Sequence, residues 1–366
     1  MRKLLYYIAI LVSVQVLWVT NVYALSLESK YPSYSYVFNE FDVPESYLYD
    51  ENFISFVKRH EKTLKKFYER SLQRGESILP MMQGQLLNDG VSDLFIYLSM
   101  IESGFSTDIV SSKKAVGLWQ FMPATAKDYN LVVCQNYDER CDAISATTAA
   151  IKHLNRLHKR FGKWYLAAMA YNCGEGCVNK AIKRAGTDDI HILTDDYLKY
   201  LPKETRLYIK KILLIAMIGE SSMLGMDDIV ATNNGLVEVE IDSETSLFDI
   251  AKMIKMDKNK LLKLNSQFKN GVPHLKNAFY NIIIPIEKIY AFYLRYDKPV
   301  MNSQDFESHM ITYQVKLGDT LESIAKQHES NVDEIKYINH IEDNNLELGK
   351  ILVITVSENV FDKVSQ

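Results

Sequence analysis

Apolar side chains between residues 52 and 225 recur at intervals of three and four positions, which is the period of an amphipathic α-helix. Charged residues occupy most of the intervening positions, so each predicted helix has one apolar face to bury. The predicted helices span residues 52–73, 78–87, 92–104, 145–161, 164–171 and 203–218, and a further one begins near residue 175. This pattern predicts a mainly α domain over residues 52–225, preceded by an extended lead-in over residues 25–51.

Beyond Gly225 the pattern changes to short alternating runs that are typical of strands, such as Val237, Val239 and Ile241. The order strand, helix, helix, strand occurs twice. The first copy has strands near 237–241 and 280–285 around helices at 247–254 and 258–264, and the second has strands at 312–315 and 351–356 around helices at 320–328 and 332–338. The 366 residues therefore divide into a helical domain and two small α+β (βααβ) modules, residues 237–286 and 312–356.

The N-terminal residues have the three-part pattern of a secretory signal. Arg2 and Lys3 precede an apolar run over residues 4–19, and Ala24 closes a small-residue cleavage site. The run is shorter than the roughly 20 residues of a membrane span. We expect cleavage after Ala24 (signal peptide, residues 1–24) and export to the periplasm or cell envelope. An uncleaved membrane anchor is the alternative.

The charge and the motifs exclude several classes of function. The chain has a net charge of −4, and removal of residues 1–24, which hold two basic and no acidic residues, makes it −6. A mildly acidic protein has no electrostatic basis for binding nucleic acid. The sequence contains no H-E-x-x-H zinc motif, no P-loop and no G-x-G-x-x-G after a strand. We therefore expect no cofactor, no metal and no nucleic-acid partner.

The four cysteines fall into two local groups, Cys134 with Cys141 and Cys173 with Cys177. In an oxidising compartment four cysteines allow three pairings, which sequence cannot distinguish. The two local pairings are favoured. A zinc site is the rival interpretation, but the spacing fits no zinc pattern and no histidine accompanies it.

Glu102 lies in the last turn of the helix predicted to end at Gly104, beside its apolar stripe. The negative end of the helix dipole and apolar neighbours both favour a protonated carboxyl group, and so raise its pKa. A carboxylic acid that stays protonated near neutral pH can protonate a leaving oxygen. Taken alone, an ordinary glutamate at a helix end is the simpler interpretation.

Three further blocks follow Glu102 in the chain. The four blocks are residues 102–105 (Glu-Ser-Gly-Phe), 117–126 (Gly-Leu-Trp-Gln-Phe-Met-Pro-Ala-Thr-Ala), 170–176 (Ala-Tyr-Asn-Cys-Gly-Glu-Gly) and 201–208 (Leu-Pro-Lys-Glu-Thr-Arg-Leu-Tyr). In this order they resemble the SLT catalytic domain of family 1 lytic transglycosylases, from about residue 53 to residue 225. The resemblance implies a lysozyme-like fold and an enzyme that acts on peptidoglycan glycan strands.

Carried over position by position, the resemblance makes Glu102 the catalytic acid and base. It implies that a further set of residues lines the substrate cleft, with Tyr208 close to Glu102. These residues are Ser103, Ser111, Gln120, Met122, Tyr171, Asn172 and Tyr208. Tyr171 and Met122 could instead be core residues.

The family reaction cleaves the bond between N-acetylmuramic acid and N-acetylglucosamine and leaves a 1,6-anhydromuramic end. Ordinary glycosidases use two carboxylates. Asp108 lies near enough in sequence to keep a muramidase resembling goose-type lysozyme open as the alternative. A non-catalytic scaffold that binds the cell wall is a further alternative.

The last module contains Tyr313-Gln314-Val315, residues 318–321 (Gly-Asp-Thr-Leu) and Ile338-Asn339 in this order. This pattern resembles LysM, a family of modules that bind chains containing N-acetylglucosamine. It implies a glycan groove formed by Gly318, Asp319, Thr320, Leu321, Asn339 and Ile341. The 237–286 module is a degenerate copy, in which Leu264-Asn265 matches Ile338-Asn339. Glycan binding and a spacer role against the catalytic domain remain equal alternatives for it. An association with the membrane or cell wall is compatible with this organisation.

Overall fold

The computed structural model describes residues 27–221, 235–273, 279–296, 309–316, 318–332 and 349–356, together with residues 335, 336, 339, 341 and 346. The predicted signal peptide and the predicted domain end at Gly225 lie outside the described residues. No helix within the described ranges is both long and apolar enough to span a membrane.

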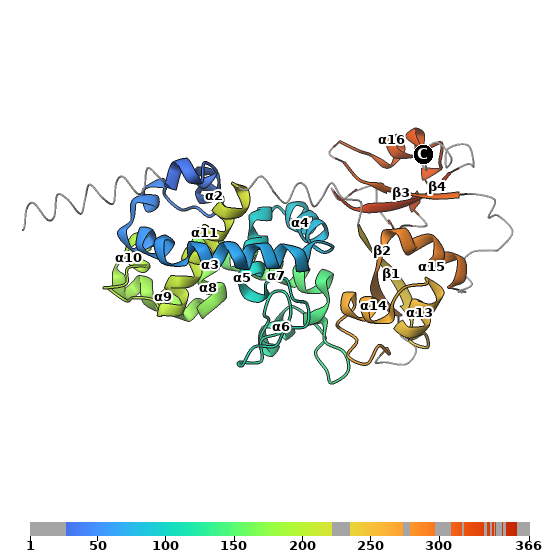
Figure 1. Ribbon diagram of the computed structural model, residues 1–366, viewed down its shortest axis with the longest axis horizontal. Helices are drawn as coiled ribbons and strands as arrows, with labels where there is room; N and C mark the ends of the chain where they lie inside the picture. The colour runs from blue at the N-terminus through green and yellow to red at the C-terminus, as the bar shows by residue number, and fades with distance from the viewer. Residues whose placement is uncertain are drawn as a thin grey trace, which may run out of the picture.

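Residues 27–221 form a helical domain in which the predicted helices are present (Figure 1). Its α-helices are α2 (Tyr34–Glu40), α3 (Glu51–Gly75), α4 (Leu79–Asn88), α5 (Ile96–Ser103), α6 (Pro123–Asp128), α7 (Ala143–Phe161), α8 (Trp164–Cys173), α9 (Glu175–Ala185), α10 (Ile190–Leu193) and α11 (Lys203–Glu220). Short 3₁₀ turns occur at η1 (Glu45–Tyr49), η2 (Asp93–Phe95) and η3 (Glu139–Cys141). The helices α6 and α10 were not predicted, because six and four residues are too few to show a helical period.

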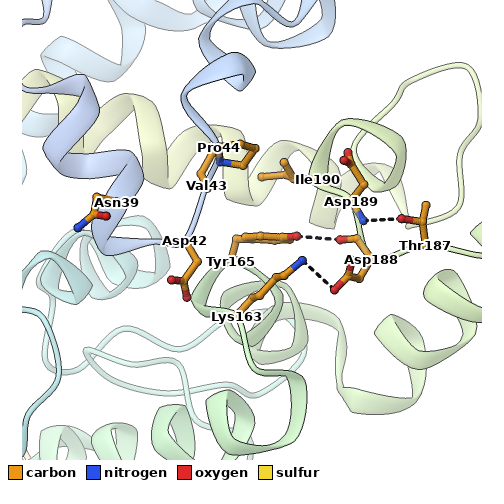
Figure 2. A pocket seen from close by; sticks show the side chains of 10 residues that line it. All are labelled: Asn39, Asp42, Val43, Pro44, Lys163, Tyr165, Thr187, Asp188, Asp189 and Ile190. Carbon is orange, nitrogen blue, oxygen red and sulfur yellow. Dashed lines mark hydrogen bonds and ion pairs between the residues drawn. The ribbon is translucent and has the colours of Figure 1, made fainter.

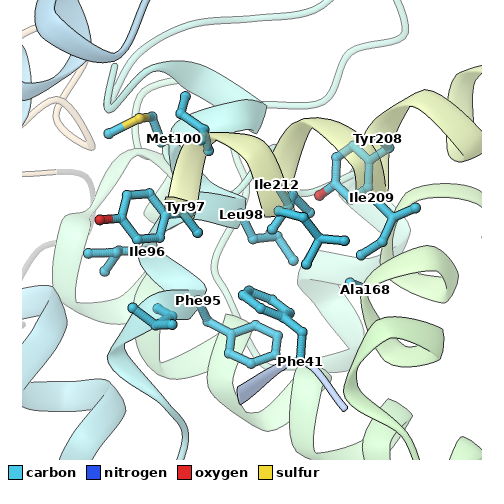
Figure 3. Close-up of a cluster of buried hydrophobic side chains, with 14 of the residues drawn as sticks. Phe41, Phe95, Ile96, Tyr97, Leu98, Met100, Ala168, Tyr208, Ile209 and Ile212 are labelled. Carbon is cyan, nitrogen blue, oxygen red and sulfur yellow. The ribbon is translucent and has the colours of Figure 1, made fainter. Parts of the chain in front are cut away.

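Helix α5 lies at the centre of this domain. Ser92 begins the turn before it by accepting a hydrogen bond from Leu94 N, and Gly104 ends it with a left-handed φ of 58°. Figure 3 shows the apolar side chains of α5 packed against those of α11 and Phe41. The buried residues labelled there are Phe41, Phe95, Ile96, Tyr97, Leu98, Met100, Ala168, Tyr208, Ile209 and Ile212. This packing fixes α5, and Glu102 with it, relative to α11.

The prediction of an extended lead-in over residues 25–51 is wrong for its described part. Helix α2 and turn η1 form there, and their aromatic residues enter the core of the helical domain. Phe38, Phe41 and Tyr47 are each fully buried. A short segment rich in tyrosine shows no helical period, but its rings are stabilised by burial against α3, which begins at Glu51.

Two small modules follow the helical domain at the same end of the molecule (Figure 1). The first contains β1 (Leu236–Asp242), α13 (Leu247–Met253), α14 (Lys258–Leu264), β2 (Phe279–Pro285), the turn η4 (Ile286–Lys288) and an unpredicted helix α15 (Ile289–Arg295). The second contains β3 (His309–Gln314), α16 (Leu321–Gln327) and β4 (Ile351–Val356). Its predicted helix at 332–338 falls only partly on described residues. Each described strand pair is antiparallel, β1 with β2 and β3 with β4.

The two modules share one internal clamp, as expected for copies of one fold. Asn265 donates to the carbonyls of Leu261 and Ile283 and accepts from Ile283 N at 2.6 Å. Asn339 makes the same three bonds. It donates to the carbonyls of Ile335 and Val353 and accepts from Val353 N. In both modules the asparagine amide therefore ties the end of the second helical segment to the last strand.

Candidate active site

The Glu102 carboxyl group is half-buried in the last turn of α5. Burial raises its pKa to about 7. A hydrogen bond from Tyr208 acts in the opposite direction, Glu204 adds a small increase, and Lys211 a small decrease. A carboxyl group with this pKa exists in both protonation states near neutral pH, so it can both donate and accept a proton.

Tyr208 projects from α11 and is 5% exposed. Its hydroxyl donates to Glu102 Oε1 at 2.5 Å. Burial and the adjacent Glu102 hold the pKa of Tyr208 well above its ordinary value, so the phenol stays protonated and serves as a donor. Because Oε1 is held by this bond, Oε2 is left as the oxygen that can carry the transferable proton.

Residues 109–121 form a folded segment, here called the Gln120 wall, with bridges between Val110 and Val116 and between Val116 and Phe121. Gln120 takes a left-handed φ of 49°, and its Nε2 donates to the carbonyls of Gly117 at 2.9 Å and Ile109 at 3.2 Å. The side-chain amide is therefore oriented with its oxygen left to accept from a ligand.

The structure assigns Ser103 a different role from the predicted substrate contact. Its hydroxyl is buried and donates to the carbonyls of Leu118 at 2.9 Å and Ser99 at 3.2 Å. Ser99 also donates to Leu118 O. Because both hydroxyls are used inside the fold, Ser103 ties the Gln120 wall to the helix that carries Glu102.

Ser111 lies near the start of the Gln120 wall, and Met122 directly follows its last residue. Ser111 is partly exposed, and its hydroxyl accepts from Ala115 N at 3.0 Å, which shapes the turn. Met122 is 42% exposed, so it is not a core residue. Its thioether is accessible for apolar contact with a ligand.

Tyr171 and Asn172 come from the last turn of α8. The Tyr171 hydroxyl donates to Trp119 O at 2.7 Å, and its ring lies 5.1 Å from that of His153 and 6.2 Å from that of Phe121. Asn172 Oδ1 accepts from the Thr205 hydroxyl at 2.8 Å. Tyr171 is thus half-buried and supports the backbone of the Gln120 wall at Trp119. Thr205 of α11 orients the Asn172 side chain.

Three side chains that support the site were not predicted: Thr147, His153 and Thr205. Trp119 is fully buried and donates to Thr147 at 2.9 Å. Burial lowers the pKa of His153 to about 4, so its ring is neutral, and Nδ1 lies 2.9 Å from the Tyr129 hydroxyl. For Thr205, its position within the fourth sequence block could have indicated a place near the site. The sequence held no such signal for Thr147 or His153.

One predicted disulfide is present and the other is not. Cys173 and Cys177 are bonded at the junction of α8 and α9, directly after Asn172. Cys134 and Cys141 are both free thiols, so their predicted pairing is wrong. Cys134 N bonds to Tyr137 O in a tight turn, whereas Cys141 lies buried beyond that turn in η3. Burial raises the pKa of the Cys141 thiol to about 12.

Figure 2 shows a pocket of about 420 Å³ whose lining includes none of the predicted site residues. Lys163 and Asp188 form an ion pair of 2.8 Å across it, and the Tyr165 hydroxyl donates to Asp188 O. These contacts join α8 to the loop before α10, so the polar groups in this pocket support structure. No cluster of three or more potential metal ligands occurs among the residues that the structure describes.

In the last module the predicted groove residues separate into two groups. Leu321 is fully buried, Ile341 is 8% exposed, and Asn339 is the clamp described above. The side chains of Leu321 and Ile341 belong to the core of the module, whereas Asn339 is half-buried, so contact of these three residues with glycan stays a prediction. Asp319 accepts from Lys316 N and the Tyr313 hydroxyl, and Thr320 caps α16. Gly318, Asp319 and Thr320 remain at the surface, where this loop can meet a ligand.

Comparison with known families gives three matches along the chain. Residues 83–193 match the transglycosylase SLT domain, residues 235–300 match the LysM-like domain of lytic transglycosylase MltD, and residues 313–355 match the LysM domain. The SLT match contains Glu102 and the Gln120 wall. The LysM-like match extends through α15, beyond the predicted end of the first module at residue 286.

Among curated proteins, the chain is similar to membrane-bound lytic murein transglycosylase D of Escherichia coli strains K12 and O6:H1. Each is 29% identical over 294 residues, which cover 77% of this chain. A putative tributyltin chloride resistance protein of Alteromonas sp. (strain M-1) is 46% identical over 86 residues, 23% of this chain and 42% of that protein. The chain spans 64% of the length of the two Escherichia coli relatives.

Proposed function

We propose that this chain is a lytic transglycosylase that cleaves the β-1,4 bond between N-acetylmuramic acid and N-acetylglucosamine in peptidoglycan. The observation that carries the proposal is the Glu102 carboxyl group, whose pKa burial raises to about 7 and which Tyr208 holds at 2.5 Å. The SLT match and the similarity to lytic murein transglycosylase D support the substrate class.

One carboxyl group serves both steps of the proposed reaction. Protonated Glu102 donates its proton to the glycosidic oxygen, and the N-acetylglucosamine leaves as an alcohol while C1 of the muramoyl residue becomes oxocarbenium-like. The Glu102 carboxylate then takes the proton from the muramoyl 6-hydroxyl, whose oxygen bonds to C1. The product has a 1,6-anhydromuramic end, and the carboxyl group regains its proton without consuming water.

The surrounding residues would bind and orient the strand. Gln120 Oε1 is oriented to accept from an N-acetyl N–H group, and the Asn172 amide nitrogen is oriented to donate to a sugar oxygen. Met122 offers an exposed apolar surface beside the wall. Ser111 contributes through the turn that it holds, and Tyr171 through its support of Trp119.

The alternative of a water-consuming muramidase requires a second carboxylate. Asp108 is exposed and accepts a hydrogen bond from the Ser106 hydroxyl at 3.0 Å. Asp108 is therefore solvated. It would have a catalytic role only in a hydrolytic reaction, in which water attacks C1 of the muramoyl residue. The non-catalytic scaffold has less support, since the carboxyl group and its tyrosine donor are arranged for proton transfer.

Mass spectrometry of the fragments released from purified peptidoglycan distinguishes these functions. We expect anhydromuropeptides from the chain without residues 1–24, and none from the Glu102→Gln variant. Reducing ends in place of anhydro ends would establish a muramidase. No released fragments, with binding to peptidoglycan retained, would establish the scaffold.

The proposal includes two further parts. The last module would bind N-acetylglucosamine-containing chains through the surface loop of Gly318, Asp319 and Thr320, which keeps the enzyme on its substrate. The chain would act in the periplasm or cell envelope after cleavage behind Ala24, with the wall or membrane as its site of attachment. N-terminal sequencing of the exported protein tests the cleavage, because an N-terminus at Met1 would mean a retained anchor.

A further inference from the structure

The LysM-like module is joined to the helical domain by a loop of that domain. The ring of Tyr137 lies 5.0 Å from that of Phe268 and 5.3 Å from that of Tyr280, so the tyrosine belongs to the core of the module. Backbone hydrogen bonds flank it, from Asp138 N to Gln267 O at 3.0 Å and from Lys269 N to Asn136 O at 3.1 Å. The contact is therefore an aromatic plug held by a short β-bridge.

A second contact lies beside the plug. The Thr107 and Ser266 hydroxyls are 3.0 Å apart, and Lys269 Nζ lies 3.6 Å from Asp138 Oδ2. The module residues used here, Ser266 to Lys269, follow α14 directly. They precede the last strand, where a LysM module is expected to form one side of its glycan groove. The helical domain covers part of that side.

From the plug, a buried ion pair leads back into the helical domain. Asp138 is 1% exposed and Arg140 is 6% exposed. The guanidinium donates to both carboxylate oxygens, from Nε at 2.9 Å and from Nη2 at 2.7 Å. Such a pair is costly to break, since the loss of either partner leaves the other charge buried and unpaired.

Arg140 also reaches the Gln120 wall. Its Nη1 donates to Phe121 O at 3.1 Å and to Lys114 O at 3.2 Å. Its own carbonyl lies so close to Gly117 that a Cβ on that glycine would be 1.8 Å from the oxygen. The guanidinium of Arg140 thus holds the Gln120 wall at Lys114 and Phe121, and the carbonyl of Arg140 packs against Gly117.

We propose that Asp138 and Arg140 are positioning residues, through which the docked LysM-like module fixes the Gln120 wall beside Glu102. The wall is bonded to α5 on its other side through Leu118 O. Module, ion pair, wall and catalytic helix therefore form one continuous set of contacts. The module would act as a part of the catalytic unit, which supports the spacer role among the two alternatives. The proposal rests on the proposed function where it concerns turnover.

Amide hydrogen exchange on the full chain tests the positioning without reference to catalysis. The amides of Val116, Gly117 and Phe121 bond within the wall and report its order. We expect these amides to exchange at least about tenfold faster in Arg140→Met. We expect the same acceleration in Tyr137→Ala, even though Tyr137 lies in the plug and the module core and not in the wall. Lys163→Met is the matched control, because it breaks the Lys163–Asp188 ion pair in a different part of the domain.

Turnover supplies the second measurement. A wall displaced by about 1 Å is expected to lower kcat on soluble glycan strands by roughly 10- to 100-fold, with a smaller change in KM. Arg140→Lys keeps the charge but not the fork of hydrogen bonds, and we expect intermediate values from it. If Arg140→Met does not fold, Lys269→Ala replaces it, with a smaller acceleration of the same amides expected.

Unchanged exchange of the wall amides in folded Tyr137→Ala and Arg140→Met would overturn the proposal. So would equal acceleration in the Lys163→Met control. Failure of the proposed function is a separate result: the wild-type chain would release no anhydro products while the exchange of the wall still depended on the module.

Discussion

The hydroxyl of Tyr208 lies 2.5 Å from Oε1 of Glu102, although 106 residues separate the two in the chain. The contact exists because α11 packs along α5 in the core of the helical domain (Figure 3). It selects one carboxylate oxygen as hydrogen-bond acceptor and leaves the other for chemistry.

Replacement of Tyr208 by phenylalanine is expected to raise the pKa of Glu102 further, because the tyrosine bond lowers it. The loss of orientation should reduce turnover by roughly 10- to 100-fold. The basic limb of the pH–rate profile should move to higher pH, which a purely structural effect would not produce. Anhydromuropeptide release measured between pH 4 and pH 9 checks both effects, and an unmoved limb would contradict the assigned bond.

The wild-type chain should lose the proposed activity as the pH rises above about 7, because the first step of the proposed reaction needs protonated Glu102. The same pKa affects stability. The folded pKa exceeds the ordinary value of 4.5, so ionisation is less favourable in the folded state, and stability falls between about pH 4.5 and pH 7.

Glu102→Gln removes the free-energy cost of ionising Glu102 in the folded state. Above pH 7 the free energy of unfolding of the variant should exceed that of the wild type by about 1–3 kcal/mol, a range that allows for the partial exposure of Glu102. Near pH 4 the two free energies should converge. Urea denaturation at several pH values measures the difference. A constant difference across this range would mean that Glu102 has an ordinary pKa.

Gly117→Ala should destabilise the Gln120 wall. Gly117 has a φ of +82°, and an added Cβ would meet Arg140 O at 1.8 Å. We expect a loss of more than about 2 kcal/mol in stability or a wall too distorted for catalysis. Gly162→Ala is the matched control, because its φ of +71° is similar but nothing lies within 4 Å of its Cβ. Equal melting temperatures for the two variants would contradict the close approach.

The Cys173–Cys177 bond should stabilise the junction that carries Asn172. The double variant Cys173→Ala, Cys177→Ala is expected to lose about 2 kcal/mol, as for a short loop in the chain-entropy account, together with part of the activity. The free thiols give the control, since Cys134→Ala should leave both properties nearly unchanged. Differential scanning calorimetry with and without reductant makes the comparison, and identical transitions would exclude a stabilising bond.

Asn339→Ala should unfold the last module without acting at a glycan groove, because its amide bonds to Ile335 and Val353. We expect the module to lose its own unfolding transition, with weaker binding as a consequence. Asp319→Ala alters the surface loop and should weaken binding to chitin oligomers with less effect on stability. An Asn339→Ala module that stays folded but does not bind would return Asn339 to the groove.

The sequence alone determined much of the local structure and the position of the proposed catalytic group, Glu102. Helical periods predicted α3, α5, α7 and α11, and Gly104 marked the helix end that places Glu102. The repeated strand–helix–helix–strand order predicted the two modules. These features depend on neighbours within about four residues, so they are encoded in short stretches of the chain.

Tertiary structure decided what those groups touch. The burial of Phe38 and Tyr47 converted an apparently extended lead-in into helix and turn. Ser103 and Asn339 were both expected to contact a ligand, but their polar groups form hydrogen bonds inside the fold. Cys134 has no disulfide partner. The Asp138–Arg140 pair gave no signal in the sequence. Each of these outcomes depends on which distant surfaces meet, because a polar or aromatic side chain takes the partner that burial leaves to it, and no local period carries that information.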